Sequence, residues 1–294
     1  MNPVLICIAR PGSRALDAKA HKAISRLVPG EPRWLAEAEA LEMPLAPHVR
    51  ARDLEDALRR ELAGIPVDVA IVPARNRRKR LLLADMDSTI IDQEVVDELA
   101  AVAGVGKAVS AITARAMRGE IEFEPALRER VALLKGLPAT AIETVIRDRI
   151  TFTPGGRTLI ATMKAHGAFT TIVSGGFTAF TGHVAGILGF DSHAANRLLI
   201  ENGRLTGRVA EPVLGKTAKV EALKRLTARL GIANEDVIAV GDGANDIAML
   251  RLAGLGVAFR GKPAVREAAS VRIDHADLTA LLYLQGYRRP EFVS

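Results

Sequence analysis

A run of apolar residues that ends in two carboxylates constrains the fold of this chain most. Residues 81–84 read Leu-Leu-Leu-Ala, and Asp85 and Asp87 follow directly. A short run with no polar position predicts a strand buried on both faces, as in parallel sheets. The carboxyl ends of such strands form the ligand-binding edge of open α/β sheets. We therefore expect a ligand site here, although the same residues are also typical of a turn and a helix cap.

The spacing of these carboxylates restricts the chemistry of the site. Like charges one residue apart either raise the pKa of one carboxyl group or hold a cation between them. Cys7 is the only cysteine, and the six histidines include no pair at metal-binding helical spacing. Any metal site must therefore use oxygen ligands, which favours Mg²⁺ or a similar hard cation.

Two further apolar runs end in polar residues. Residues 169–173 precede Ser174 and two glycines, and residues 237–240 precede Asp242 in a glycine-bounded loop. A loop alone would also use Ser-Gly-Gly, whereas a helix cap does not account for Asp242. Helices alternate with these strands after residue 81, which predicts a parallel sheet covered on both faces.

A long helical stretch interrupts this alternation. Helices are predicted over residues 94–102, 107–118, 123–134 and 139–149. The insert, about residues 92–150, exceeds the dozen residues that a simple crossover needs, so we expect a lid over the site. Asn202-Gly203 between apolar runs predicts a hairpin, which we interpret as structural.

The first quarter of the chain suggests a separate α+β module of ferredoxin-like type. Strands are predicted over residues 3–9 and 67–72, and helices over 18–27 and 53–62. Residues 34–45 stay ambiguous, because their composition favours a helix while a sheet context could override it. Pro73 and the basic run after it indicate a domain boundary, with residues 1–74 as one domain and 75–294 as the other. The module is either regulatory or oligomerising, or only a structural extension.

The composition limits the classes of partner. The formal net charge is +6, and the densest basic run covers residues 75–80. A solvated linker explains this run better than a nucleic-acid surface, because no aromatic residues interleave with it. No segment approaches eighteen uninterrupted apolar residues, so no membrane span is predicted. The amino terminus lacks the features of an export signal, so we expect a cytoplasmic protein.

Four ordered motifs resemble those of the haloacid dehalogenase-like phosphatases, and in detail those of the phosphoserine phosphatases. They are Asp-Met-Asp-Ser-Thr (85–89), Val-Ser-Gly-Gly-Phe (173–177), a lysine, and Gly-Asp-Gly-Ala-Asn-Asp (241–246). The lid is similar at Met117, at residues 123–131 and at residues 134–138. The resemblance implies an α/β fold, a Rossmann-like parallel sheet with a helical cap, from residue 81 to about 280. Residues 1–74 could be a divergent ACT-like regulatory domain.

The resemblance also implies roles for the acidic residues. Asp85 would be the nucleophile that takes the phosphoryl group, and Asp87 would be the general acid and base. Asp85, Asp242 and the backbone carbonyl of Asp87 would hold Mg²⁺, with Asp246 and the substrate-contacting Asn245 close by.

The phosphate would be bound by Ser174, the Gly175 amide and a lysine. We choose Lys219 for the lysine, because its distance from the Gly-Asp-Gly loop fits the family spacing, and keep Lys216 in reserve.

A closed pocket for phosphoserine needs one acid and one base for the amino-acid part of the substrate. Glu94 and Arg130 match the family positions for these roles, and Met117 and Phe123 would supply apolar walls.

The leading hypothesis is a Mg²⁺-dependent hydrolase that releases L-serine from O-phospho-L-serine through an aspartyl-phosphate, the last step of serine synthesis in the family it resembles. One rival changes the substrate to phosphothreonine or another small phosphomonoester, or transfers the phosphoryl group to an acceptor. Another is an amino-acid-binding regulatory protein with a retired phosphatase domain. A homodimer and an amino-acid effector of residues 1–74 stay open, and neither membrane nor nucleic acid is an expected partner.

Overall fold

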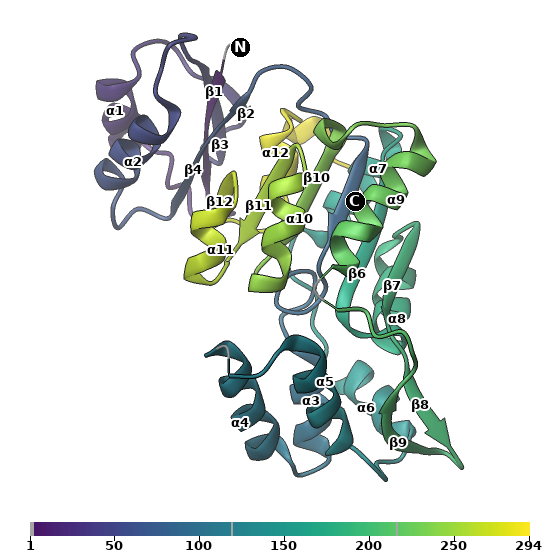
Figure 1. The fold of residues 1–294 in the computed structure, drawn as a ribbon. Helices are drawn as coiled ribbons and strands as arrows, with labels where there is room; N and C mark the ends of the chain where they lie inside the picture. Colours follow the sequence, from purple (N-terminus) through teal and green to yellow (C-terminus); the bar gives the residue numbers. More distant parts are fainter. Residues whose placement is uncertain (1–2, 119, 216) are drawn as a thin grey trace. The chain divides into compact units, whose positions relative to one another are not determined.

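The computed structural model describes residues 3–118, 120–215 and 217–294 (Figure 1). Gly119 lies outside the described residues. So does Lys216, the reserve choice for the catalytic lysine. The chain divides into two compact units. One comprises the chain up to residue 82 with residues 153–170 and 227–294, and the other comprises residues 83–152 and 171–226.

A six-stranded sheet has the order β12-β11-β10-β5-β6-β7. Its strands are β5 (Leu81–Ala84), β6 (Phe169–Phe177), β7 (Ser192–Asn196), β10 (Val237–Gly241), β11 (Leu255–Phe259) and β12 (Val271–Ile273). The pairs β10–β11, β11–β12 and β6–β7 are parallel. Between the strands the chain forms α7 (Gly156–Ala165), α8 (Thr178–Leu188), α9 (Ala218–Leu230), α10 (Ile247–Leu252) and α11 (Pro263–Ala268), and α12 (Ala280–Leu284) follows β12. The α/β core predicted from the alternation of strands and helices is confirmed.

The central strand β5 is buried as the sequence predicts. All four of its residues have no exposed surface. Because every position packs against apolar neighbours, only the residues that follow it can bring polar groups to the strand end. β6 is longer than predicted, since it continues through Ser174 and both glycines to Phe177.

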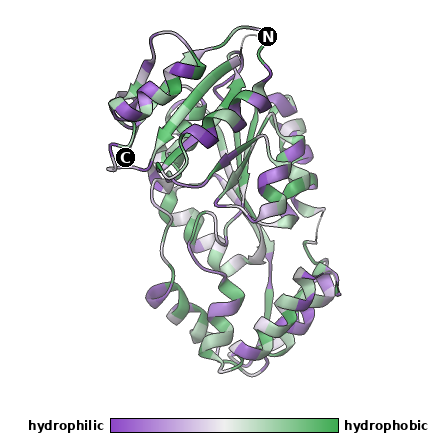
Figure 2. Cartoon of the chain, turned by 90° about the vertical axis from the view of Figure 1, so that its left-hand side faces the viewer, coloured by the Kyte–Doolittle hydropathy of each residue, from purple (hydrophilic) through white to green (hydrophobic). Residues whose placement is uncertain are grey.

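The amino-terminal module contains a four-stranded antiparallel sheet of order β2-β3-β1-β4. Its elements are β1 (Pro3–Ala9), α1 (Ala18–Leu27), β2 (Arg33–Ala36), β3 (Ala40–Pro44), α2 (Ala51–Glu61) and β4 (Val67–Pro73). Its strands are largely apolar and its helices carry many hydrophilic residues, as Figure 2 shows by colour. This arrangement is consistent with the predicted ACT-like fold.

The ambiguous segment 34–45 forms the hairpin β2–β3 rather than a helix. β3 pairs with β1 along its length, and Leu41 and Met43 join the apolar core of the module. Ala38 has a φ of 55° at the turn. Tertiary pairing with β1 therefore overrides the helix propensity of this alanine- and glutamate-rich segment.

The helical insert forms four helices, α3 (Val95–Val102), α4 (Gly106–Met117), α5 (Phe123–Ala132) and α6 (Thr140–Asp148). The hairpin β8 (Leu198–Glu201) and β9 (Arg204–Val209) turns at Asn202 and Gly203, which have φ values of 50° and 71°. Backbone hydrogen bonds join this hairpin to residues 136–139, for example from Gly136 N–H to the Leu205 carbonyl at 2.8 Å. The hairpin thus extends the helical insert.

Among the described residues, no helix is both long and apolar enough to cross a membrane.

Candidate active site

Asp85 forms a buried ion pair with Lys219. Asp85 follows β5, and Lys219 lies in the first turn of α9. The Lys219 ammonium nitrogen lies 2.8 Å from Asp85 Oδ2, and Asp85 Oδ1 accepts the Met86 N–H at 2.8 Å. Both residues are about 5% exposed or less. The carboxylate is thus held by an ammonium and an amide, away from most of the solvent.

Asp87 has an environment that disfavours its charged form. Burial raises its pKa well above the ordinary value, and the charges of Glu94 and Asp85 raise it further. The Val95 N–H, 3.4 Å from Asp87 Oδ2, and the charge of Lys219 act in the opposite direction. Asp87 Oδ1 is buried without a hydrogen-bond partner among the described residues. A carboxyl group that keeps its proton to an unusually high pH can serve as a general acid.

The turn after Asp87 positions Glu94. The carbonyl of Met86 accepts N–H groups from the residues at positions 89, 90 and 91, at 3.2, 2.8 and 3.0 Å. Ser88 has a φ of 54°, and its hydroxyl donates to Glu94 Oε1 at 2.8 Å. This compact turn returns the chain to the start of α3, so the carboxylate of Glu94 lies near that of Asp87.

The end of β6, which contains Ser174, Gly175 and Gly176, passes close to Asp87. The Gly176 N–H donates to Ser174 Oγ at 2.9 Å, and a Cβ placed on Gly176 would lie 3.3 Å from Asp87 Oδ2. A Cβ on Gly175 would lie 2.8 Å from Cζ of Phe123 in α5. Glycine is therefore needed here for close approach, both to a carboxyl group and to an aromatic ring of the helical insert.

Asn196 supports this end of β6, and the sequence analysis did not predict its role. This buried residue ends β7, and its amide group donates to the Gly175 carbonyl at 3.0 Å. Its Oδ1 accepts the Leu214 N–H at 2.8 Å. The signal that could have indicated it is a polar amide side chain directly after two alanines, at the carboxyl end of a strand.

Arg130 in α5 lies among acidic groups. Burial lowers its pKa, whereas the charges of Asp97, Glu94 and Asp87 raise it, in that order. Its Nε–H donates to the Ala126 carbonyl at 3.3 Å. The predicted pair of Glu94 and Arg130 is therefore brought together near Asp87. Asp97, one turn after Glu94, is an acidic neighbour that the sequence did not single out.

Of the predicted apolar walls, Phe123 lies against Gly175, as described above. Met117 is the last residue of α4, and its side chain is not among the described parts of the structure.

The glycine-bounded loop after β10 holds two buried carboxylates. Asp246 Oδ2 accepts the Gly243 N–H at 2.9 Å, and a Cβ on Gly241 would overlap the Asp246 carboxylate. Asp242 Oδ2 lies 3.5 Å from the ammonium nitrogen of Lys262. Asn245 is partly buried in the same loop.

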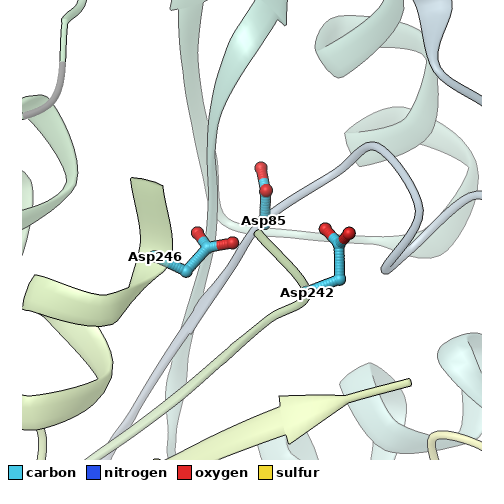
Figure 3. Close-up of side chains that lie close together, drawn as sticks. All are labelled: Asp85, Asp242 and Asp246. Atoms are coloured by element: carbon cyan, nitrogen blue, oxygen red, sulfur yellow. The ribbon is translucent and has the colours of Figure 1, made fainter. Parts of the chain in front are cut away.

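Three carboxylates converge in Figure 3. One oxygen from each of Asp85, Asp242 and Asp246 lies within 4.8 Å of the other two, and all three residues are buried. Buried carboxylates this close repel each other unless protons or a cation compensate them. The donor set consists of oxygen atoms only, which fits a hard divalent cation such as Mg²⁺. The side chain of Asp246, predicted only to lie close by, is part of this acidic cluster.

Comparison with known proteins gives consistent matches. Residues 82–251 match the family model of the haloacid dehalogenase-like hydrolases. The phosphoserine phosphatase of Streptomyces coelicolor is 46% identical over 245 residues, which are 83% of this chain and 60% of that protein. The phosphoserine phosphatase of Lactococcus lactis is 48% identical over 204 residues, which are 69% of this chain and 94% of that protein. The chain thus spans about three fifths of the first relative and nearly all of the second.

Solved structures agree with these matches. A haloacid dehalogenase family hydrolase from Salmonella enterica superposes with a TM-score of 0.86 at 31% identity, covering 96% of this chain and 98% of that one. A phospho-aspartyl intermediate analogue of phosphoserine phosphatase superposes with a TM-score of 0.66 at 44% identity, covering 70% of this chain and 98% of that one. The resemblance inferred from the four motifs is confirmed.

Proposed function

The chain belongs to the haloacid dehalogenase-like hydrolase family, and we propose that it hydrolyses O-phospho-L-serine to L-serine and phosphate. The observation that carries this proposal is the buried pair of Asp85 and Lys219, 2.8 Å apart, beside a second carboxyl group of raised pKa. Its similarity to two phosphoserine phosphatases supports the choice of substrate.

In the first step, a carboxylate oxygen of Asp85 forms a bond to phosphorus while the bond from phosphorus to the serine oxygen breaks. Asp87 gives its proton to that leaving oxygen. Because burial keeps Asp87 protonated to a higher pH than a solvated aspartate, the proton is available for this transfer. The product is an acyl phosphate on Asp85 and free serine.

In the second step, Asp87 takes a proton from water as the water oxygen attacks phosphorus. The bond between phosphorus and Asp85 breaks, which releases phosphate and restores the carboxylate. Lys219 keeps its charge beside Asp85 in both steps and offsets the negative charge that develops on the phosphoryl oxygens.

The remaining phosphoryl oxygens would be bound by Ser174 Oγ and the Gly175 amide, with Asn245 as a further substrate contact. Mg²⁺, held by Asp85, Asp242 and the Asp87 carbonyl with Asp246 close by, would reduce the repulsion between an anionic nucleophile and an anionic phosphate.

The amino-acid part of the substrate carries one ammonium and one carboxylate. Glu94 would bind the ammonium and Arg130 the carboxylate, while Met117 and Phe123 would close the pocket from the helical insert. Both charged groups neighbour Asp87, so they can reach the two ends of a molecule as small as phosphoserine. An ester without these groups would lack the contacts to the half-buried Glu94 and Arg130 that phosphoserine would make, so we expect it to be a poorer substrate.

The test is phosphate release from phosphoserine by wild type and by Asp85→Asn, with Mg²⁺ present. We expect near-complete loss in the variant, because an amide oxygen is a poor nucleophile, and no loss in the exposed control Asp148→Asn. Removal of Mg²⁺ with a chelator should abolish wild-type turnover. Unchanged turnover by folded Asp85→Asn would refute the assigned nucleophile.

The substrate is tested with phosphothreonine and with a phosphomonoester that lacks the amino-acid groups. We expect phosphoserine to be hydrolysed fastest. Equal rates on all three esters would contradict the roles of Glu94 and Arg130 and favour a general phosphatase.

The amino-terminal module is the basis for three further proposals. A domain boundary after residue 74, an amino-acid effector bound by the module, and a homodimer follow from its ACT-like fold. A cytoplasmic location follows from the proposed biosynthetic reaction. Binding of L-serine to an Asp85→Asn variant, measured by calorimetry, and the mass in solution test the effector and the dimer.

A further inference from the structure

A buried carboxylate of the amino-terminal module binds the chain that follows β12. Asp68, in β4, is 2% exposed. Its two oxygens accept the N–H groups of Asp274 at 2.8 Å, of His275 at 3.2 and 3.1 Å, and of Ala276 at 2.8 Å. Successive N–H groups that converge in this way form an anion-binding nest, and here a side chain of the same protein fills it.

These hydrogen bonds compensate an unfavourable placement, because a carboxylate buried inside a sheet loses its contact with water. Every residue of β4 from Val67 to Ala70 is buried, so Asp68 has no solvated face. Burial raises its pKa, and only the three N–H donors and the charge of His275 act against that rise. The carboxylate is therefore held where it fixes the backbone of residues 274–276.

The fixed segment orients Asp274, which contacts α11. Asp274 Oδ1 lies 3.3 Å from Nη2 of Arg266, and Asp274 Oδ2 lies 3.6 Å from Nε of Arg272. Arg266 in turn donates its Nε–H to the carbonyl of Gly261 at 2.6 Å. Arg266 therefore links the loop before α11 to residues 274–276, which Asp68 binds.

The same loop contacts a member of the acidic cluster. The Lys262 N–H donates to the Asp242 carbonyl at 3.0 Å, and the Lys262 ammonium nitrogen lies 3.5 Å from Asp242 Oδ2. The Arg260 N–H donates to the carbonyl of Ile273, the last residue of β12, at 2.7 Å. The backbone and the side chain of Asp242 are therefore both held by a loop that is anchored to β12.

We propose that Asp68 is a positioning residue for the metal site, which acts on Asp242 through Asp274, Arg266 and Lys262. The inference rests on the proposed binding of Mg²⁺ by Asp242. Residues that hold a metal ligand in place raise the affinity for the ion, because less order has to be imposed when it binds. The amino-terminal module would then contribute to the catalytic site without touching the substrate.

The experiment measures Mg²⁺ binding directly, by calorimetry of the full chain, together with turnover as a function of Mg²⁺ concentration. Asp68→Asn keeps the side-chain volume but presents an amide N–H₂ group to N–H donors. We expect its Mg²⁺ affinity to fall about tenfold, in the range typical of residues that orient metal ligands. Turnover at saturating Mg²⁺ should stay near the wild-type value. The exposed Asp56→Asn, in the same module, is the matched control.

Arg266→Met provides a second variant on a partly exposed side chain, in case Asp68→Asn does not fold. It should weaken Mg²⁺ binding to a similar degree. In the double variant the loss should be no larger than in either single variant, because both changes break the same chain of contacts.

Three results would overturn the inference. They are unchanged Mg²⁺ affinity in folded Asp68→Asn or Arg266→Met, fully additive losses in the double variant, and a fall in turnover at saturating Mg²⁺ without a change in affinity. If wild type itself binds no Mg²⁺, the proposed metal site fails together with the inference, whereas intact wild-type binding with unaffected variants refutes the inference alone.

Discussion

Replacement of Lys219 by methionine tests the electrostatics of the site without reference to substrate. The ammonium lies 2.8 Å from Asp85 Oδ2, and both side chains are at most 7% exposed. Solvent therefore screens the pair little, and the Met86 N–H alone cannot replace a full positive charge. Removing one partner of a buried ion pair typically costs about 3–5 kcal/mol, because the other charge stays buried.

We expect Lys219→Met to lose about 3 kcal/mol of unfolding free energy in the presence of a chelator. That loss corresponds to a factor of roughly 100 in the unfolding equilibrium constant. Urea unfolding followed by circular dichroism measures the loss. Adding Mg²⁺ should recover part of it, because the proposed binding of the ion by Asp85 would place positive charge beside this carboxylate.

The exposed Arg225→Met, on the same helix, is the matched control and should change stability by less than about 0.5 kcal/mol. Equal stability of Lys219→Met and Arg225→Met in chelator would refute the reasoning. So would a loss in Lys219→Met that Mg²⁺ does not reduce at all.

Two further predictions concern positions outside the ion pairs. Gly175→Ala should lower kcat/KM about tenfold, since its Cβ would lie 2.8 Å from Cζ of Phe123 and the ring would have to move. Steady-state kinetics measure this, and an equal loss in a Phe123→Leu background would show that the ring is not the cause. Burial raises the pKa of the Cys7 thiol to about 12, so the stability that depends on its protonation is full below pH 9 and falls as pH rises towards 12. From pH 9 to pH 10, wild type should lose about 1 kcal/mol more than Cys7→Ala, and parallel stability curves would contradict this.

Features with a local physical cause were predictable from the sequence. The strand at residues 81–84 follows from four apolar residues in a row, and the hairpin at Asn202-Gly203 follows from two residues that accept a positive φ. The predicted bounds of the four helices of the insert differ from the observed ones by about two residues or fewer, since glycines and Pro138 mark these boundaries. Motif spacing also led to Asp85 and Lys219, which the structure holds 2.8 Å apart.

Features that depend on distant partners were decided only by the tertiary structure. Residues 34–45 have the composition of a helix, yet they form strands because β1 offers them a hydrogen-bonding edge. In the sequence, Asp68 is a single polar residue in a predicted strand, and Asn196 is a single polar residue after two alanines. Their roles depend on N–H and carbonyl groups of residues 274–276 and of Gly175, which no local pattern reveals.

The sequence by itself determined which reactive side chains this protein has and which strands bring them to the carboxyl edge of the sheet. The reason is that apolar runs and turn residues specify the structure of only the few residues around them. The tertiary structure decided which of these groups meet. Burial and charge at a given side chain depend on atoms far along the chain, so the raised pKa of Asp87 and the binding of residues 274–276 by Asp68 exist only in the folded protein.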